Sequence, residues 1–552
     1  MPLKTALRWL HFSSLVVYRT ITWAILGCAF AFALIVMAVR FWVLPHMPDY
    51  REPIARQLSD SMHQRVAIGS LEGHWSGLNL QLALGNVVIY DRANEPALTL
   101  ERIDGTLSWW SLVFMEPRFD SIEIDRPELN VKRNAQGVIS VAGIEISGNT
   151  DGGGLSDWLL RQEEISIRGA AISWEDEARG APTLELKRVD FRLENDLYEH
   201  RFGLRAEPPR ELATPLDVRG KFTGRTVKAV QQWNGQLFTQ LDYTNIAGWR
   251  TWVPFPVYFP HGAGALRAWL TLKNGELGQI IADVELSQVT TRLAADLPDL
   301  ELTELKGRVG WKQLDDGFEF STTRLAMATQ ETKLQPTDLK FAYYRAGKRP
   351  ARGEMTANNL DIAPLIAVAD HLPFEPAMRK EFTDYAPRGS LQDVALKWTG
   401  QWPNPEQYSV KARFTKLGIN PVGRVPGLDG VSGSVDGSER GGTVLLSTQN
   451  AAVDMPLVFD GKLDFETLSA QVGWQRNGNA YEVRLNDVSF TNRDMAGGVS
   501  GVYQAAATGP GTIDLTGHAS RADARSVARY LPRHISERAR EWLAASLLGG
   551  NS

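Results

Sequence analysis

The chain has 552 residues, of which 43% are hydrophobic and 22% are charged, and its formal net charge is -5. These proportions are typical of a folded chain and argue against disorder. The charge, without a basic tract interleaved with aromatics, argues against nucleic acid as a partner. The single cysteine, Cys28, excludes an intramolecular disulfide and a thiolate cluster, so we expect no metal, no cofactor and no redox chemistry.

The first predicted element is a membrane-spanning helix over residues 20–39. Twenty uncharged residues lie between Arg19 and Arg40, and as a helix they rise about 30 Å, the thickness of the hydrocarbon core. A cleaved signal peptide would need a shorter apolar region and a small-x-small site, which MAVRFW does not supply. The predicted anchor residues are Thr20, Trp23, Val39 and Trp42.

The basic residues on the two sides of this helix balance, and only the short tail with its α-amine favours an inside N-terminus. We therefore expect residues 1–45 to be a cytoplasmic tail and anchor. Residues 46–65 are predicted to form an amphipathic helix, because Ile54, Leu58 and Met62 recur every four positions. This helix could cap the end of a β body or bind the membrane surface, and the cap is the favoured interpretation.

Residues 66–350 are predicted to be almost continuously β. In TLELKRVDFRL, from Thr183 to Leu193, the apolar alternation skips two polar positions at Lys187 and Arg188 and then resumes. Because side chains alternate between the faces of a strand, this skip would turn the second half to the wrong face unless a bulge absorbs a residue.

The same spacing recurs from Leu98, Leu300, Leu334 and Leu463, which indicates an internal repeat of two short strand segments joined by a bend. Both segments should turn their apolar side to one interior. The residues predicted to line it are Leu98, Leu100, Leu107, Leu184, Leu186, Phe191, Leu300, Leu302, Val309, Leu463, Phe465 and Val472. The alternative is that they fill the dry core of a closed sandwich.

Several segments interrupt the strands. Residues 146–154 read as a loop followed by a short helix over residues 155–161, and the proline-rich residues 253–264 as a rigid connector. Residues 351–390 and 518–552 form a larger duplication, each copy with a strand, a helix ending at Leu-Pro and a second short helix. Residues 391–517 continue the β body. Because the second copy stops early, we expect more β structure downstream.

The search for catalytic motifs gives weak signals only. The nine histidines show no metal-ligand spacing, and the Gly430 to Ser434 stretch lacks the final glycine of a nucleophile elbow. Acidic pairs such as Glu175 and Asp176 are typical of hairpin tips, although a membrane-anchored carbohydrate hydrolase would also use paired carboxylates. The tryptophans at strand ends favour core packing over sugar stacking. We expect no enzyme.

Five features follow each other along the chain: the N-terminal anchor, the amphipathic helix, VAIGSLEGHWSGLNLQLALGNVVIYD, IDRPELNVKRNAQGVISVAGI and the late LP-helix-WL-G segment. In this order they resemble the AsmA-like family, most closely its large YhdP-type members. The resemblance implies a mainly β fold: a transmembrane helix, then an elongated, twisted, repetitive antiparallel sheet curved into a groove, with a few short helices. It also implies a single-pass protein of the Gram-negative inner membrane with its large body in the periplasm.

Such proteins are thought to carry phospholipid toward the outer membrane. The resemblance therefore implies phospholipid and the inner membrane as partners, with outer-membrane or periplasmic proteins contacted through more distal parts. A periplasmic scaffold that assembles outer-membrane proteins along its sheet edges is the alternative hypothesis.

Overall fold

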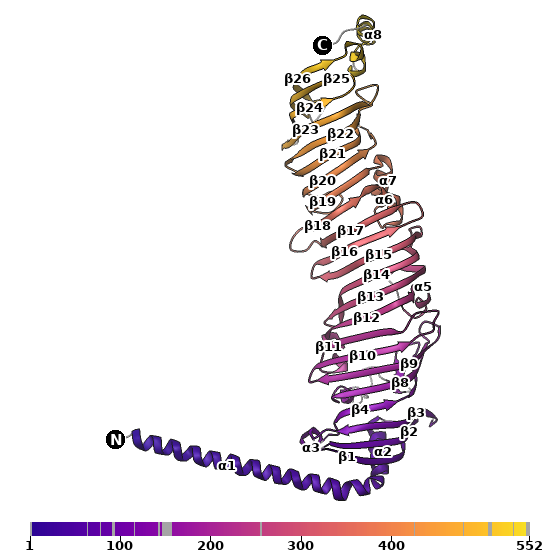
Figure 1. Cartoon of the computed structure of the whole chain (residues 1–552), viewed down its shortest axis with the longest axis vertical. Helices are drawn as coiled ribbons and strands as arrows, with labels where there is room; N and C mark the ends of the chain where they lie inside the picture. Colours follow the sequence, from indigo (N-terminus) through magenta and orange to yellow (C-terminus); the bar gives the residue numbers. More distant parts are fainter. Residues whose placement is uncertain are drawn as a thin grey trace. The chain divides into compact units, whose positions relative to one another are not determined.

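The computed structural model is mainly β, as the sequence predicts, with a long N-terminal apolar helix and a few short helices (Figure 1). It describes residues 3–62, 65–77, 79–90, 94–114, 116–141, 144–145, 157–253, 257–423, 425–478, 480–505, 511–533 and 535–547. The predicted loop at 146–154 lies outside these ranges. The chain divides into two compact units, Met1–Arg210 with Thr214–Gln236, and Glu211–Ala213 with Leu237–Ser552.

The first unit begins with helical segments and continues as a sheet. Its helical segments are α1 (Leu3–Ala38), the π-helical turn η1 (Val39–Val43), the 3-10 segment η2 (Leu44–Tyr50), α2 (Arg51–Met62), α3 (Trp110–Phe114) and η3 (Val227–Gln232). Its strands are β1 (Val66–Ser76), β2 (Asn79–Tyr90), β3 (Pro96–Leu107), β4 (Phe119–Asp125), β5 (Glu128–Arg133), β6 (Ile139–Val141), β7 (Ile144–Glu145), β8 (Glu164–Asp176), β9 (Ala181–Asp196), β10 (Glu199–Glu207) and β11 (Leu216–Thr223).

Strands of this unit that follow each other in sequence mostly pair antiparallel, β1 to β4 in one run and β8 to β11 in another. The two runs are joined by parallel pairing of β4 and β5 with β8. β12 (Asn234–Asn245) crosses the boundary between the units.

In the second unit the strands β13 to β26 each pair antiparallel with the next, a plain meander. They are β13 (Tyr258–Lys273), β14 (Glu276–Arg292), β15 (Leu300–Leu314), β16 (Gly317–Ala328), β17 (Lys333–Tyr344), β18 (Arg352–Asp361), β19 (Arg388–Thr399), β20 (Gln407–Ile419), β21 (Gly427–Ser438), β22 (Gly441–Asp454), β23 (Leu463–Asn477), β24 (Ala480–Thr491), β25 (Met495–Gln504) and β26 (Thr512–Ala522). The helical segments are α5 (Ile246–Trp249), α6 (Ile362–Ala367), η4 (Ala369–His371), α7 (Pro376–Tyr385), η5 (Ala524–Tyr530) and α8 (Glu537–Ser546).

Some predicted boundaries differ from the structure. The connector prediction for 253–264 is wrong from Tyr258 onward, because β13 starts there and contains Pro260. Its pairing with β14 is irregular at this point, with register shifts around His261, so no regular ladder bond is lost at the proline. The segment 351–390 begins and ends in strands, β18 and β19, and its helices occupy only the middle.

The predicted bend at Lys187 and Arg188 is present. Arg188 lies in β9 with φ 47, a left-handed conformation that costs a non-glycine residue energy. The register of the pairing between β9 and β10 shifts between Arg205 and Glu207 of β10, as a bulge requires. The apolar residues on either side, Leu186 and Phe191, therefore stay on one face of the sheet.

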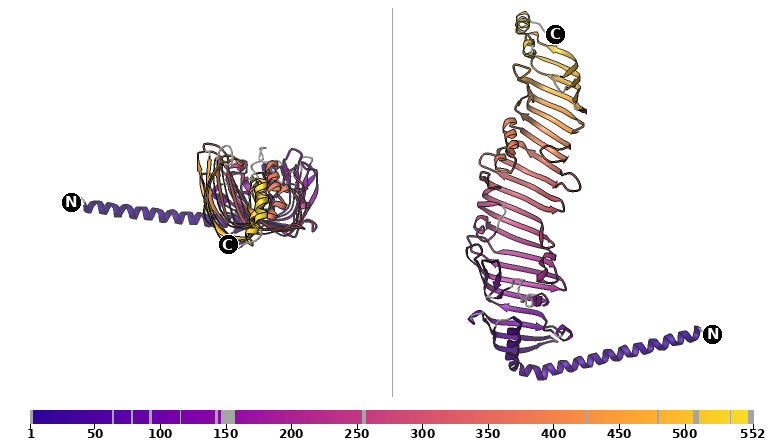
Figure 2. Two further views of the ribbon diagram at one scale, coloured as in Figure 1. Left: turned by 90° about the horizontal axis from the view of Figure 1, so that it is seen from above. Right: turned by 180° about the vertical axis from the view of Figure 1, so that it is seen from behind.

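In the related repeats the neighbouring strand supplies the bend. Asn86, Gln288 and Asn450 have φ values of 50, 49 and 54. They lie in β2, β14 and β22, level with the skipped polar positions of β3, β15 and β23. The strands of each unit are accordingly bent rather than flat (Figure 2).

A pair of substitutions at Arg188 tests this bend. Both substitutions remove the contact of the Arg188 guanidinium with Glu207. The difference between their free energies of unfolding therefore measures the conformational preference of the backbone at this position. We expect Arg188→Val to have a free energy of unfolding about 1 kcal/mol lower than Arg188→Gly, because φ 47 suits glycine and penalises a β-branched residue. Urea unfolding of the detergent-solubilised chain measures this difference.

Lys187 gives the matched control, since it is exposed and outside the left-handed region. There the order should reverse, with valine the more stable variant because strands favour β-branched residues. The same order at both positions would contradict the bend.

Candidate functional site

The two faces of the sheet differ in chemistry. In β15 the apolar residues Leu300 and Leu302 are buried, whereas Lys306 and Arg308, which point the other way, are exposed. The same division follows from the alternation in β9 and β23. We call the side that carries the predicted residues the apolar face.

The outer face is held by ion pairs between neighbouring strands. Arg308 donates two hydrogen bonds to Asp283, from Nε to Oδ1 at 2.6 Å and from Nη2 to Oδ2 at 2.9 Å, and these lower the pKa of that carboxyl. Lys306 pairs with Glu285 on the same two strands. These groups are half exposed, so the outer face is a hydrated, charged surface that does not favour hydrocarbon.

The residues predicted to line the interior fall into two groups by exposure. Five are buried: Leu98, Leu100, Leu184, Leu300 and Leu302. The others are partly exposed: Leu107, Leu186, Phe191, Val309, Leu463, Phe465 and Val472. Within each of β3 and β15 the buried residues precede the bend and the partly exposed one follows it.

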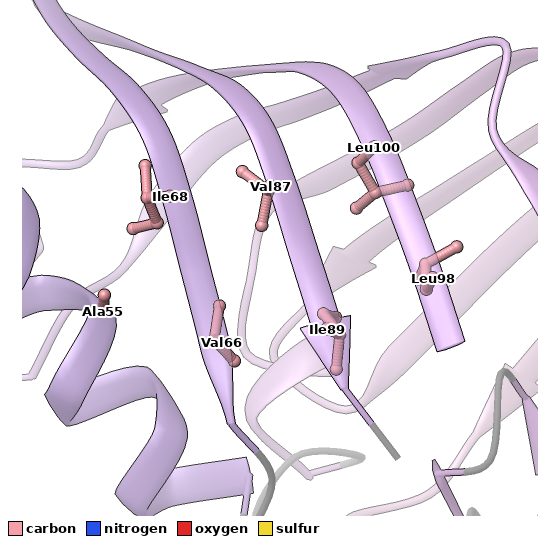
Figure 3. Close-up of a cluster of buried hydrophobic side chains, with 7 residues drawn as sticks. All are labelled: Ala55, Val66, Ile68, Val87, Ile89, Leu98 and Leu100. Carbon is pink, nitrogen blue, oxygen red and sulfur yellow. The ribbon is translucent and has the colours of Figure 1, made fainter. Parts of the chain in front are cut away.

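Helices account for the buried group in two places. In the first unit, Ile54, Ala55 and Leu58 of α2 belong to the hydrophobic cluster of Val66, Ile68, Val87, Ile89, Leu98 and Leu100. Figure 3 shows Ala55 of α2 beside the side chains of β1, with β2 and β3 following on the same side. The amphipathic helix therefore packs on the first strands of the body.

In the second unit, Leu300 and Leu302 cluster with Ile246 of α5 and with Val368 and Leu372, which flank η4. Val368 is 2% exposed. These short helical segments cover the apolar face where β14 ends and β15 begins. This part of the face is therefore a dry core.

Beyond the bends, aromatic rings lie along the apolar face. Phe191, Phe202 and Phe222 of β9, β10 and β11 form a row with ring centroids 6.3 and 5.8 Å apart, and the second pair is stacked. A Cβ on Gly220 would lie 2.3 Å from the Phe202 ring, so the ring covers a glycine of the next strand. Flat rings over glycines keep the face smooth and apolar.

The sequence analysis missed Phe202 and Phe222, and likewise Phe318 and Phe341 in the second unit, whose rings are 6.0 Å apart. The signal was present in the aromatic residues at matching positions of consecutive strands. The predicted repeat did not include β10, β11 and β16. Phe341 lies in the copy that starts at Leu334, but no residue of that copy was predicted to line the interior.

The polar residues considered for catalysis have structural partners. Asp176 is 2% exposed and accepts hydrogen bonds from Arg133, with Arg179 also within ion-pair distance. His200 hydrogen-bonds Asn195 and the Gly224 carbonyl and stacks on Trp233. Within the described ranges, no three His, Cys, Asp or Glu side chains converge as a metal site would need.

The predicted anchor residues lie on one continuous helical segment. Thr20 and Trp23 are in α1, and Val39 and Trp42 in η1. Of the helices that the structure describes, this one is long and apolar enough to cross a membrane, and its side chains are exposed.

The fold is thus an N-terminal apolar helix followed by a repetitive, mostly antiparallel sheet with one apolar, partly open face. The family model described as YhdP protein matches residues 4–552, so the chain belongs to the YhdP family. The resemblance expected from the sequence is thus confirmed.

A curated relative is the intermembrane phospholipid transporter YhdP of Escherichia coli (strain K12). It is 21% identical over 547 residues, which cover 94% of this chain and 41% of the relative. The chain therefore spans about two fifths of that protein's length. No solved structure matches this chain.

Two substitutions in β15 test the division of the apolar face. We expect Leu302→Ala to lower the free energy of unfolding by about 2 to 4 kcal/mol, because it leaves a cavity under the helical segments. Val309→Ala, on the partly exposed side of the same strand, should cost less than about 1 kcal/mol. Urea unfolding followed by tryptophan fluorescence measures both, and equal losses would mean that the two halves are equally enclosed.

Proposed function

We propose that this protein is anchored by α1 in the inner membrane, with its body in the periplasm, and that the open part of the apolar face shields phospholipid acyl chains on their way toward the outer membrane. The single observation that carries the proposal is the partial exposure of apolar side chains on this face, such as Leu107, Phe191, Val309 and Val472 beyond the bends. Soluble monomers seldom keep a long apolar surface in contact with water unless something binds there.

The physical need is large. Transfer of a sixteen-carbon chain into water costs about 12 kcal/mol at about 0.8 kcal/mol per methylene, so a phospholipid rarely leaves a bilayer unaided. A face lined by side chains such as Phe191, Val309 and Val472 removes most of that cost without any covalent step. The polar head group would stay at the rim in water, as it does at a bilayer surface.

The helices refine where the lipid would lie. Since α2 and the α5 and η4 segments pack on residues before the bend, acyl chains would occupy the part of the face beyond it. In this proposal Leu98, Leu100, Leu300 and Leu302 form the dry core that holds the sheet's curvature. Leu107, Phe191, Val309 and Val472, which lie beyond the bends, contact lipid.

The proposed layout keeps the predicted parts in order. Residues 1–45 are tail and anchor, residues 66–350 and 391–517 carry most of the lipid-binding sheet, and the helical segments between and after them cover the face locally. The name of the E. coli relative, intermembrane phospholipid transporter, supports this proposal.

A charge placed on the apolar face should abolish lipid binding. We expect Val472→Glu to reduce the phospholipid that co-purifies with the chain at least several-fold, since a carboxylate in a hydrocarbon path is strongly unfavourable. Mass spectrometry of extracted lipid measures the ratio of lipid to protein. Val472 is paired with Val444 on the same face.

The matched control is Leu445→Glu. Leu445 neighbours Val444 in β22, pairs with Gln471 and is 49% exposed on the outer face. It should fold and bind lipid normally. Equal lipid content in both variants would rule out the apolar face as the lipid site, and photo-cross-linking from position 472 that captures proteins without lipid would favour the scaffold hypothesis.

A further inference from the structure

The first unit carries an exposed apolar patch at its membrane-proximal end. Three side chains of α3 form it, Trp110, Val113 and Phe114, with exposed fractions of 60%, 65% and 51%. We call these three residues the base patch. The Trp110 and Phe114 rings are 5.8 Å apart, so the patch is continuous rather than scattered.

The residue next to the base patch touches the apolar helix. The ring centroids of Trp109 and Phe32 are 4.7 Å apart, and Trp109 also lies 6.3 Å from Trp75 at the end of β1. Trp109 thereby links α1 to the end of the first strands, and α3 lies beside the helix (Figure 1).

The contact has a definite depth along α1. Phe32 lies seven residues before Val39, the last residue of the uncharged stretch, which corresponds to about 10 Å along a helix. Half of the hydrocarbon core is about 15 Å. If α1 spans a membrane, Trp109 reaches below the head groups of the leaflet on the Arg40 side.

The position of the body relative to the exit of the helix is fixed by packing. Met47 of η2 is 6% exposed, and a Cβ on Gly73 of β1 would lie 2.5 Å from Leu44 Cδ2, so η2 lies directly on the strand. Arg51 Nη1 donates a hydrogen bond to the Gly69 carbonyl oxygen at 3.1 Å. These contacts hold the first strands close to the membrane segment.

The edge of the patch has the chemistry of a bilayer interface. The Arg118 guanidinium lies 3.8 Å from the centre of the Phe114 ring. Tryptophan, phenylalanine and arginine together are typical of side chains that lie at the boundary between acyl chains and head groups.

We propose that the base patch is a membrane-docking element, inserted in the leaflet on the Arg40 side of the bilayer that α1 spans. Its partner is the lipid surface itself. Docking would place the first strands of the apolar face at the level of the acyl chains, so that a lipid could enter without crossing water. The inference rests on the proposed anchoring of α1, but not on lipid transport.

The single native cysteine makes a depth measurement direct. Three single-cysteine chains are needed: the native chain with Cys28, Cys28→Ser with Val113→Cys, and Cys28→Ser with Val230→Cys as matched control. Val230 is 48% exposed on η3 of the same unit and outside the base patch. Each is labelled with an environment-sensitive dye and reconstituted in phosphatidylethanolamine–phosphatidylglycerol vesicles.

Quenching by lipids that carry a spin label at a shallow or a deep acyl position, and by aqueous iodide, then reports the depth. We expect Cys28 to be quenched by the deep label, position 113 by the shallow label with at least threefold protection from iodide, and position 230 by iodide alone. Circular dichroism checks that the β content is unchanged.

The outcomes separate the two proposals. If Cys28 escapes lipid quenching, α1 does not span the bilayer, and both the anchoring and the docking are wrong. If Cys28 is quenched but position 113 behaves like position 230, the anchoring holds and the docking inference is overturned, which would leave the base patch for a protein partner.

Discussion

The structure depends on one backbone constraint: a strand of the repeat must bend while it keeps its apolar side chains on one face of the sheet. A strand of period two cannot skip two polar residues without reversing its faces, so a residue must leave the extended conformation. Arg188 does this within its own strand. At the matching level of three other repeats a left-handed residue, Asn86, Gln288 or Asn450, lies in the neighbouring strand. Each left-handed residue costs about 1 kcal/mol. The bends that these residues allow make the sheet curve toward its apolar side along each unit.

The apolar face is covered in some places and partly open in others. In β3 and β15 the side chains before the bend form ordinary hydrophobic cores, in the first unit under α2 and in the second under α5 and η4. Leu107 and Val309, after the bend in the same strands, are partly exposed, and elsewhere on the face the Phe202 ring lies over a glycine of the adjacent strand. The outer face, crossed by ion pairs such as Arg308 with Asp283, stays hydrated. Under the proposed function a lipid would therefore meet one suitable surface, and the buried clusters would hold the sheet without it.

The anchor and the body are connected more closely than a tether would require. The η2 segment lies on β1, α2 caps the first strands, and Trp109 reaches Phe32 of the apolar helix. A carrier that moves a molecule out of a bilayer gains from such proximity, because each ångström of water between the hydrocarbon core and the apolar face adds exposed methylene surface.

The sequence by itself determined the class of fold, the apolar helix and the bend at Arg188, because hydropathy, strand alternation and phase are local properties of the chain. The family followed from the resemblance of particular segments and their order. Only the tertiary structure decided that Leu300 and Leu302 are covered while Val309 and Val472 are partly open, since Ile246 and Val368 are distant in sequence from the strand they cover. The strand at Tyr258 and the contact of Trp109 with Phe32 were likewise out of reach of the sequence, because both arise from neighbours that strand periodicity does not encode.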